Sequence, residues 1–171
     1  MSVPNLSSLQ PAVFDSGPLI YLDSLGYAEQ IPELNHVLAP PAVLRELAAR
    51  PDEPGGRLPG RIWLERKVPK PEYVNRVGQE PPTLGEGEKE TIALALQLGA
   101  LAVLDDLRAR RRARLLGVGL TGTLGVLLRL HRPGQRSHLR PRESGRSRDV
   151  LFRSGTRRGP QSKRRLSTAE S

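Results

Sequence analysis

The sequence predicts a three-layer α/β/α fold with a mainly parallel central sheet. Short apolar segments alternate along the chain with longer helix-like segments, and Gly- and Pro-rich turns separate them. Strands that alternate with helices form a mainly parallel sheet with helices on both faces. Acidic residues follow several of the apolar segments, and in sheets of this kind ligands bind beyond the carboxyl ends of the strands.

The elements follow from the pattern of apolar residues and turn residues. Strands are expected over residues 12–14, 36–39, 100–104 and 118–120, with an edge strand within 62–68. Helices are expected over residues 19–25, 42–49, 84–98, 107–116 and 124–130. Pro40 and Pro41 open the second helix, because proline costs nothing where the N–H has no helical partner. Gly99 ends the third, and residues 51–60 and 69–82 are expected to be loops.

Length and composition exclude several classes of protein. A chain of 171 residues is long enough for one domain. The absence of cysteine excludes disulfides, thiolate zinc sites and cysteine nucleophiles. No segment predicts a signal peptide or a membrane span, since the most apolar stretch, 115–130, is short and rich in glycine. We therefore expect a cytoplasmic protein without a membrane partner.

The net charge of +9 is confined to the end of the chain. Residues 1–130 contain 15 basic and 15 acidic residues, whereas residues 131–171 contain 12 basic and 3 acidic ones. We expect a domain over residues 1–131 and a basic, disordered tail over 132–171, because the tail has too few apolar residues to offset its chain entropy. Two interpretations of the tail remain open: a segment that binds RNA nonspecifically, or a change of reading frame near residue 131.

Acidic residues occur at four places where an expected strand or helix begins or ends. Asp15 and the pair Asp105-Asp106 directly follow apolar strands, and Glu46 lies in the second helix. Each has a structural alternative: Asp15 and the Asp pair as turn or N-cap residues, and Glu46 as a solvated surface residue. Gathered at one sheet edge, these oxygens would suit Mg²⁺ or Mn²⁺.

The fourth place is the start of the third helix, where three glutamates occur. Glu86 stands three residues after Thr83, the spacing of a capping box, and is expected to be structural. Glu88 shares a helical face with Ile92, whereas Glu90 lies on a more mixed face. Glu88 is therefore the expected metal ligand of the three.

Five segments in this order resemble the motifs of PIN-domain nucleases. They are 13–20 (VFDSGPLI), 40–47 (PPAVLREL), 87–95 (GEKETIALA), 104–110 (LDDLRAR) and 121–127 (TGTLGVL). The resemblance is greatest to small prokaryotic PIN proteins related to the toxins of toxin–antitoxin pairs. It covers residues 12–131, and the basic segment that follows is atypical of those proteins.

The resemblance implies a PIN-like fold and a metal-dependent ribonuclease. Asp15, Glu46, Glu88 and Asp106 would hold Mg or Mn, with Asp105 competing for the fourth position. Ser16 would orient a carboxylate or a water molecule. RNA would be the substrate, an antitoxin protein a partner, and a homodimer the expected assembly, since relatives commonly dimerise. The alternative is a PIN-like module that binds RNA or protein and has lost its chemistry.

The expected helix 107–116 is rich in arginine and follows directly after Asp106. Its first turn would face the acidic residues, so Arg108 or Arg110 could contact a phosphate of the substrate. The alternative is a solvated helix face built from a strong helix former.

Overall fold

The structure is a computed structural model that describes residues 9–78 and 84–131. Five parallel strands form one sheet in the order β3-β2-β1-β4-β5. Their bounds are β1 Pro11–Phe14, β2 His36–Ala39, β3 Leu64–Arg66, β4 Leu101–Val103 and β5 Leu120–Thr121. The central strand, β1, pairs through Val13 with Leu38 of β2 and with Ala102 of β4. The predicted parallel sheet is therefore confirmed.

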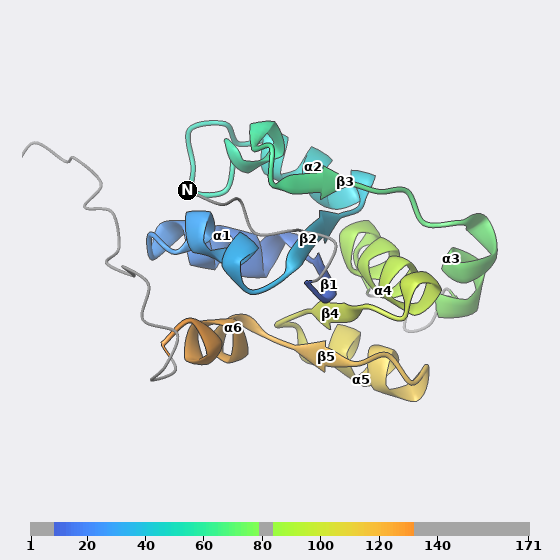
Figure 1. The fold of residues 1–171 in the computed structure, drawn as a ribbon. Helices are drawn as coiled ribbons and strands as arrows, with labels where there is room; N and C mark the ends of the chain where they lie inside the picture. The colour runs from blue at the N-terminus through green and yellow to red at the C-terminus, as the bar shows by residue number, and fades with distance from the viewer. Residues whose placement is uncertain (1–8, 79–83, 132–171) are drawn as a thin grey trace, which may run out of the picture.

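Helices cover both faces of this sheet and make the three predicted layers (Figure 1). One face carries α1 (Ser16–Ser24), the 3₁₀ helix η2 (Ala28–Glu33), α2 (Pro41–Ala48) and α6 (Thr123–Leu130). The other carries α3 (Pro71–Val77), α4 (Glu86–Leu98) and α5 (Leu107–Leu115). A short 3₁₀ helix, η3 (Leu58–Gly60), precedes β3.

Two buried clusters fill the spaces between the layers, and the alternation of side chains along β1 separates them. Ala12 and Phe14 point into the cluster under α1, η2 and α6. Val13, between them, points into the cluster under α4 and α5. Successive side chains of a strand point to opposite faces, so an apolar run is needed where both faces are covered. Within the described residues, no helix combines the length and apolar character needed to cross a membrane.

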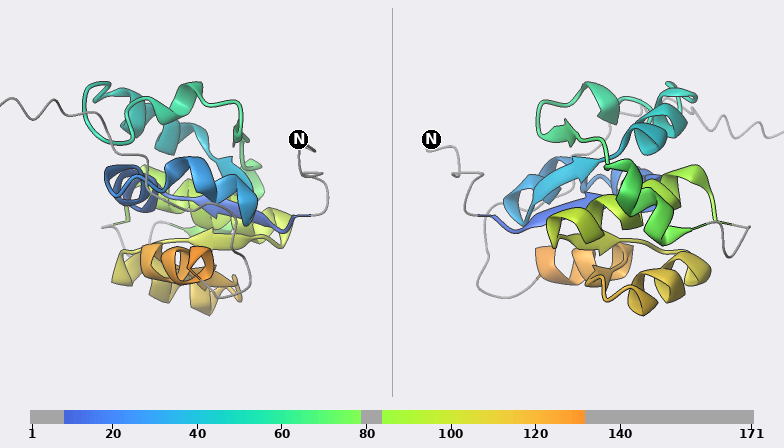
Figure 2. Two further views of the ribbon diagram at one scale, coloured as in Figure 1. Left: turned by 60° about the vertical axis from the view of Figure 1, so that its left-hand side comes forward. Right: turned by 90° about the vertical axis from the view of Figure 1, so that its right-hand side faces the viewer.

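The two edges of the sheet carry different segments. The chain from α2 through η3 to β3 lies at one edge. Both α5 and α6 lie at the β5 edge, each on its own face of the sheet (Figure 2). The carboxyl ends of all five strands share one side because every pair is parallel. This arrangement brings the residues that follow β1 and β4 next to each other.

The expected loop over 69–82 was wrong in its first half, where α3 occupies Pro71–Val77. The prolines suggested a loop, but Pro71 stands at the first helical position, where its missing N–H has no cost. The other boundaries differ by a few residues. The helix expected at 19–25 begins at Ser16, and the strand expected at 118–120 is Leu120–Thr121. The expectation of a disordered tail over 132–171 lies outside the described residues.

Candidate metal centre

Asp15 and the Asp105-Asp106 pair lie beside each other because β1 and β4 are neighbours. The backbone N–H of Asp15 donates to the carbonyl oxygen of Val103 at 3.1 Å, just past the end of β1. Asp105 and Asp106 come two and three residues after Val103. The strands that follow β1 in the chain are placed first on one side of it (β2 and β3) and then on the other (β4 and β5). The site lies at the carboxyl ends of β1 and β4, where this change occurs, which is the usual ligand position in such sheets.

Glu46 joins this region from the second half of α2. The hydroxyl of Ser16 donates to Oε2 of Glu46 at 2.7 Å, so the start of α1 contacts α2. On the other side of the carboxylate lies Gly87, in the first turn of α4. A Cβ built on Gly87 would stand 2.7 Å from Oε1 of Glu46, closer than real Cβ atoms approach an oxygen. The lack of a side chain at residue 87 thus makes room for Glu46.

Glu88 lies in the same turn of α4 and caps the helix. Its Oε2 accepts a hydrogen bond from the N–H of Gly85 at 2.8 Å. The expected capping role of Glu86 was wrong, because the helix starts at Glu86 with Gly85 as its N-cap and the exposed Glu86 pairs with Arg45 at 2.9 Å. Thr83, its expected partner, lies outside the described residues. The third glutamate, Glu90, accepts from the N–H of Ala42 at the start of α2.

Asp106 and Asp105 have different partners although they are adjacent. Asp106 is the N-cap of α5, and its Oδ1 accepts from the N–H groups of Arg108 at 2.8 Å and Ala109 at 3.0 Å. Asp105 reaches across to α6. Its Oδ1 accepts from the N–H of Thr123 at 2.9 Å, and its Oδ2 accepts from the Thr123 hydroxyl at 2.5 Å. Both carboxyl groups therefore have hydrogen-bond donors, Asp106 in the first turn of α5 and Asp105 at the start of α6.

Arg110 ties the ends of β4 and β5 together. Its Nη1 donates to the carbonyl oxygens of Leu104 at 2.8 Å and Thr121 at 3.0 Å. Gly122 lies against this contact, since a Cβ there would stand 2.6 Å from Oδ1 of Asp105 and 3.0 Å from Nη1 of Arg110. The arrangement gives the Arg110 side chain a structural task at the ends of β4 and β5.

Asp15 is buried, with 8 % of its surface exposed. Burial raises the pKa of Asp15 from an ordinary 3.8 to about 7, opposed by a hydrogen bond from the backbone of Ser16. The charges that add to this increase belong to Glu88, Glu46 and Asp105. All three are negative, so each disfavours the ionised form of Asp15.

The half-buried Glu88 shows the same pattern. Burial raises its pKa, and the negative charges of Asp106 and Glu46 raise it further. The hydrogen bond from Gly85 and the positive charge of Arg108 act in the opposite direction. Together with Asp15, these interactions bring all five predicted carboxyl groups into one electrostatic neighbourhood, although they come from four separate segments of the chain.

The oxygen donors fit a hard divalent cation in their chemistry. A cation would remove the repulsion among these acids and favour the ionised form of the buried Asp15. Among residues 9–78 and 84–131, no three acidic or histidine side chains are spaced to hold a metal ion as they lie. As they lie, Ser16, the N–H of Gly85 and Thr123 each hold one carboxylate through a hydrogen bond.

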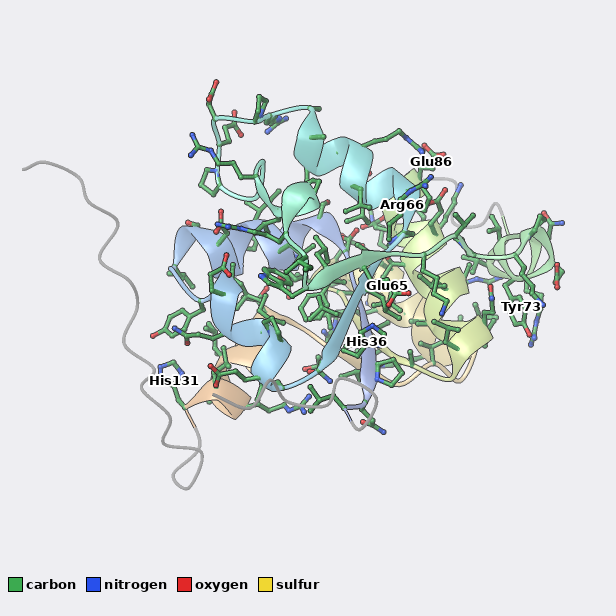
Figure 3. The ribbon with its side chains drawn as sticks, turned by 45° about the horizontal axis from the view of Figure 1, so that its top comes forward. His36, Glu65, Arg66, Tyr73, Glu86 and His131 are labelled. Atoms are coloured by element: carbon green, nitrogen blue, oxygen red, sulfur yellow. The ribbon has the colours of Figure 1, made fainter. Side chains whose placement is uncertain are left out.

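The histidines of the described region lie in other contacts. Nε2 of His36 lies 2.6 Å from Oε2 of Glu65, so the pair joins β2 to β3 at the sheet edge (Figure 3). Nε2 of His131 lies 3.1 Å from the hydroxyl oxygen of Tyr27, at the end of α6. Neither contact involves any of the five acidic residues of the candidate site.

Sequence reasoning missed the two glycines that accommodate acids. Gly87 stands inside the first turn of α4, where glycine costs about 0.5–1 kcal/mol relative to alanine. A glycine inside a predicted helix could have been noticed from the sequence alone. Its contact with Glu46 could not have been predicted, because forty-one residues separate the two positions.

The raised pKa of Asp15 predicts a pH-dependent effect of Asp15→Asn on the metal-free protein. As the pH rises from about 4 through about 7, unfolded chains release a proton that the folded protein retains, so stability falls. Asparagine does not ionise, so the stability of the variant does not fall in this way. Its free energy of unfolding should match wild type near pH 4 and exceed it near pH 8, by at most ~4 kcal/mol. Urea unfolding at both pH values measures the difference. Asp52→Asn, at an exposed residue, is the control, and a pH-independent difference would contradict the assignment.

Gly87→Ala should move the Glu46 carboxylate without unfolding the protein. The clash involves the end of a flexible side chain, and alanine raises helix propensity by up to about 1 kcal/mol. We expect unchanged or slightly increased stability, and Mn²⁺ affinity lowered roughly 10- to 100-fold. Calorimetric titration with Mn²⁺ measures the affinity. Gly60→Ala is the matched control, because a Cβ there meets nothing within 4 Å. Wild-type affinity in the folded Gly87→Ala protein would show that the position of Glu46 is irrelevant to metal binding.

Comparison with known proteins agrees with the fold. A protein-family model, DUF3368, described as a PIN domain, matches residues 11–142. The match spans the whole sheet and all the acidic residues discussed above. A search of curated proteins found no match to the chain. PIN domains form a nuclease-type superfamily whose members generally use divalent metal ions. The chain belongs to the PIN-domain family.

Proposed function

We propose that the protein is a metal-dependent endoribonuclease that uses Mg²⁺ or Mn²⁺. The observation that carries this proposal is the burial of Asp15 among negative charges only. Clustering carboxylates raises the free energy of the folded protein unless a cation neutralises their charge. The other acids each have a structural contact of their own, but none of these contacts brings a positive charge to the buried Asp15.

Asp15, Glu46, Glu88 and Asp106 would hold the ion. Asp106 is favoured over Asp105 because the two bonds that it accepts both go to Oδ1. Asp105 uses both oxygens on Thr123 and so fixes the start of α6. Its contribution would be to position the turn that carries Asp106.

A bound divalent ion supplies a water of lowered pKa and stabilises charge that develops on a phosphate. The residues of the chain would do the rest. Ser16 holds the Glu46 carboxylate in place through its hydroxyl. Arg108, whose charge acts on Glu88, lies where it could bind a phosphate of the RNA.

Purified wild-type protein should cleave single-stranded RNA internally with Mn²⁺ or Mg²⁺ and fail to do so with EDTA. Asp15→Asn should lower both metal affinity and cleavage by at least about 100-fold, because a neutral amide is a poor ligand for a hard cation. Calorimetry gives the affinity, and gel analysis of a labelled RNA gives the cleavage. Asp52→Asn should leave both unchanged.

Cleavage that persists in EDTA would contradict a role for the metal. A folded wild-type protein that binds Mn²⁺ and RNA but cleaves nothing would favour the alternative, a PIN-like binding module without chemistry.

The toxin role is a further part of the proposal and rests on the resemblance to small prokaryotic PIN toxins. If the protein cuts cellular RNA, its induction in a bacterial host should stop growth, and induction of Asp15→Asn to the same level should not. An antitoxin would be a protein that restores growth when it is produced together with the wild type. Equal growth arrest by both proteins would show that RNA cleavage is not the cause.

A further inference from the structure

The arginines of α5 fall into two groups with different surroundings. Only Ala109 and Ala113 of this helix are fully buried, so the small side chains hold it against the sheet. Arg110 and Arg112 flank them and donate to backbone carbonyls: Arg110 to Leu104 and Thr121, and Arg112 to Arg76 and Val77. These two guanidinium groups therefore join α5 to neighbouring segments of the chain.

Arg108, Arg111 and Arg114 face outward instead. All three are exposed, and within the described part of the chain none of their side chains makes a hydrogen bond or an ion pair. The exposed Leu107 and Leu115 lie on the same side, because the five residues fall within about 120° of the helix circumference at 100° per residue. We call these five residues the outer face of α5.

The outer face starts at the candidate metal centre. Arg108 is two residues from Asp106, and its charge acts on Glu88. From there α5 leads away from the carboxyl ends of the strands. A rise of 1.5 Å per residue puts Arg114 about 9 Å beyond Arg108. Unpaired arginines in such a row favour a polyanion over a small ligand, since each guanidinium can bind a separate phosphate.

We propose that the outer face of α5 binds the backbone of single-stranded RNA on its way to or from the metal centre. This inference rests on the proposed function for the identity of the polyanion, and it extends the substrate site beyond Arg108 to Arg111 and Arg114. Continuity with the acidic cluster favours RNA over an acidic protein, because a cleavable strand has to enter and leave that cluster.

The test compares two variants of the full chain with the same loss of charge. Arg111→Gln/Arg114→Gln removes the two distal arginines, and glutamine has a similar helix propensity. Arg57→Gln/Lys70→Gln removes two exposed basic residues elsewhere. Lys70 lies at the far end of α4, since its N–H donates to Gln97. Residues 132–171 are present in all the proteins, so their charges contribute equally.

Binding of a short fluorescein-labelled oligouridylate is measured by anisotropy across a range of NaCl concentrations, with EDTA present to prevent cleavage. Each lost phosphate contact reduces the slope of log K against log salt by about 0.7 for single strands, so the α5 variant should lose about 1.4. The control variant should keep the wild-type slope. Equal slopes in all three proteins, or equal losses in both variants, would overturn the inference, as would absence of binding by wild type.

The binding test and the cleavage test fail separately. A reduced slope in the α5 variant, with no metal-dependent cleavage by wild type, would support the RNA-binding face and contradict the nuclease proposal. Cleavage by wild type with unchanged slopes would support the nuclease and overturn the face.

Discussion

The burial of a carboxyl group among other carboxylates is the constraint on which the candidate site depends. The parallel sheet with β1 at its centre brings the ends of β1 and β4 together, and α2 and α4 add Glu46 and Glu88. Asp15 is buried in this group, and the neighbouring charges that act on it are negative. Such a group destabilises the folded protein unless its members stay protonated, find hydrogen-bond donors, or share a cation.

The rest of the local structure can be understood as a response to that constraint. Ser16, the N–H of Gly85 and Thr123 each donate to one of the acids, and the first turn of α5 does the same for Asp106. Gly87 and Gly122 leave the space in which Glu46 and Asp105 lie. These donors stabilise the acids without a metal ion. In the proposed site, a metal ion would have to displace some of these hydrogen bonds, and this would lower its net affinity.

The sequence was sufficient to predict the parallel sheet, because its strands follow from local patterns of apolar and turn residues. The strand 36–39 was located correctly, since an apolar run between turn residues is unambiguous when prolines follow it directly. The helix α3 was missed because its prolines stand next to it and at its first position, where they are compatible with a helix but equally typical of a loop.

The partners of the acids could not be predicted, because they come from distant segments. The pairing of Ser16 with Glu46 joins α1 to α2, and that of Asp105 with Thr123 joins β4 to α6. From the sequence, either Arg108 or Arg110 could have contacted a phosphate. Only the structure distinguishes the two, because the side chain of Arg110 donates to carbonyl oxygens at the ends of β4 and β5.

Anomalous diffraction from crystals soaked in Mn²⁺ tests the central claim most directly. The account predicts one or two anomalous peaks at the carboxyl edge of β1 and β4, within coordination distance of oxygens of Asp15 and at least two of Glu46, Glu88 and Asp106. It also predicts that the contacts Ser16–Glu46 or Gly85–Glu88 are broken or lengthened in the soaked crystals. Crystals that show no peak at this edge at saturating Mn²⁺, with both contacts intact, would contradict the claim that these acids form a metal centre.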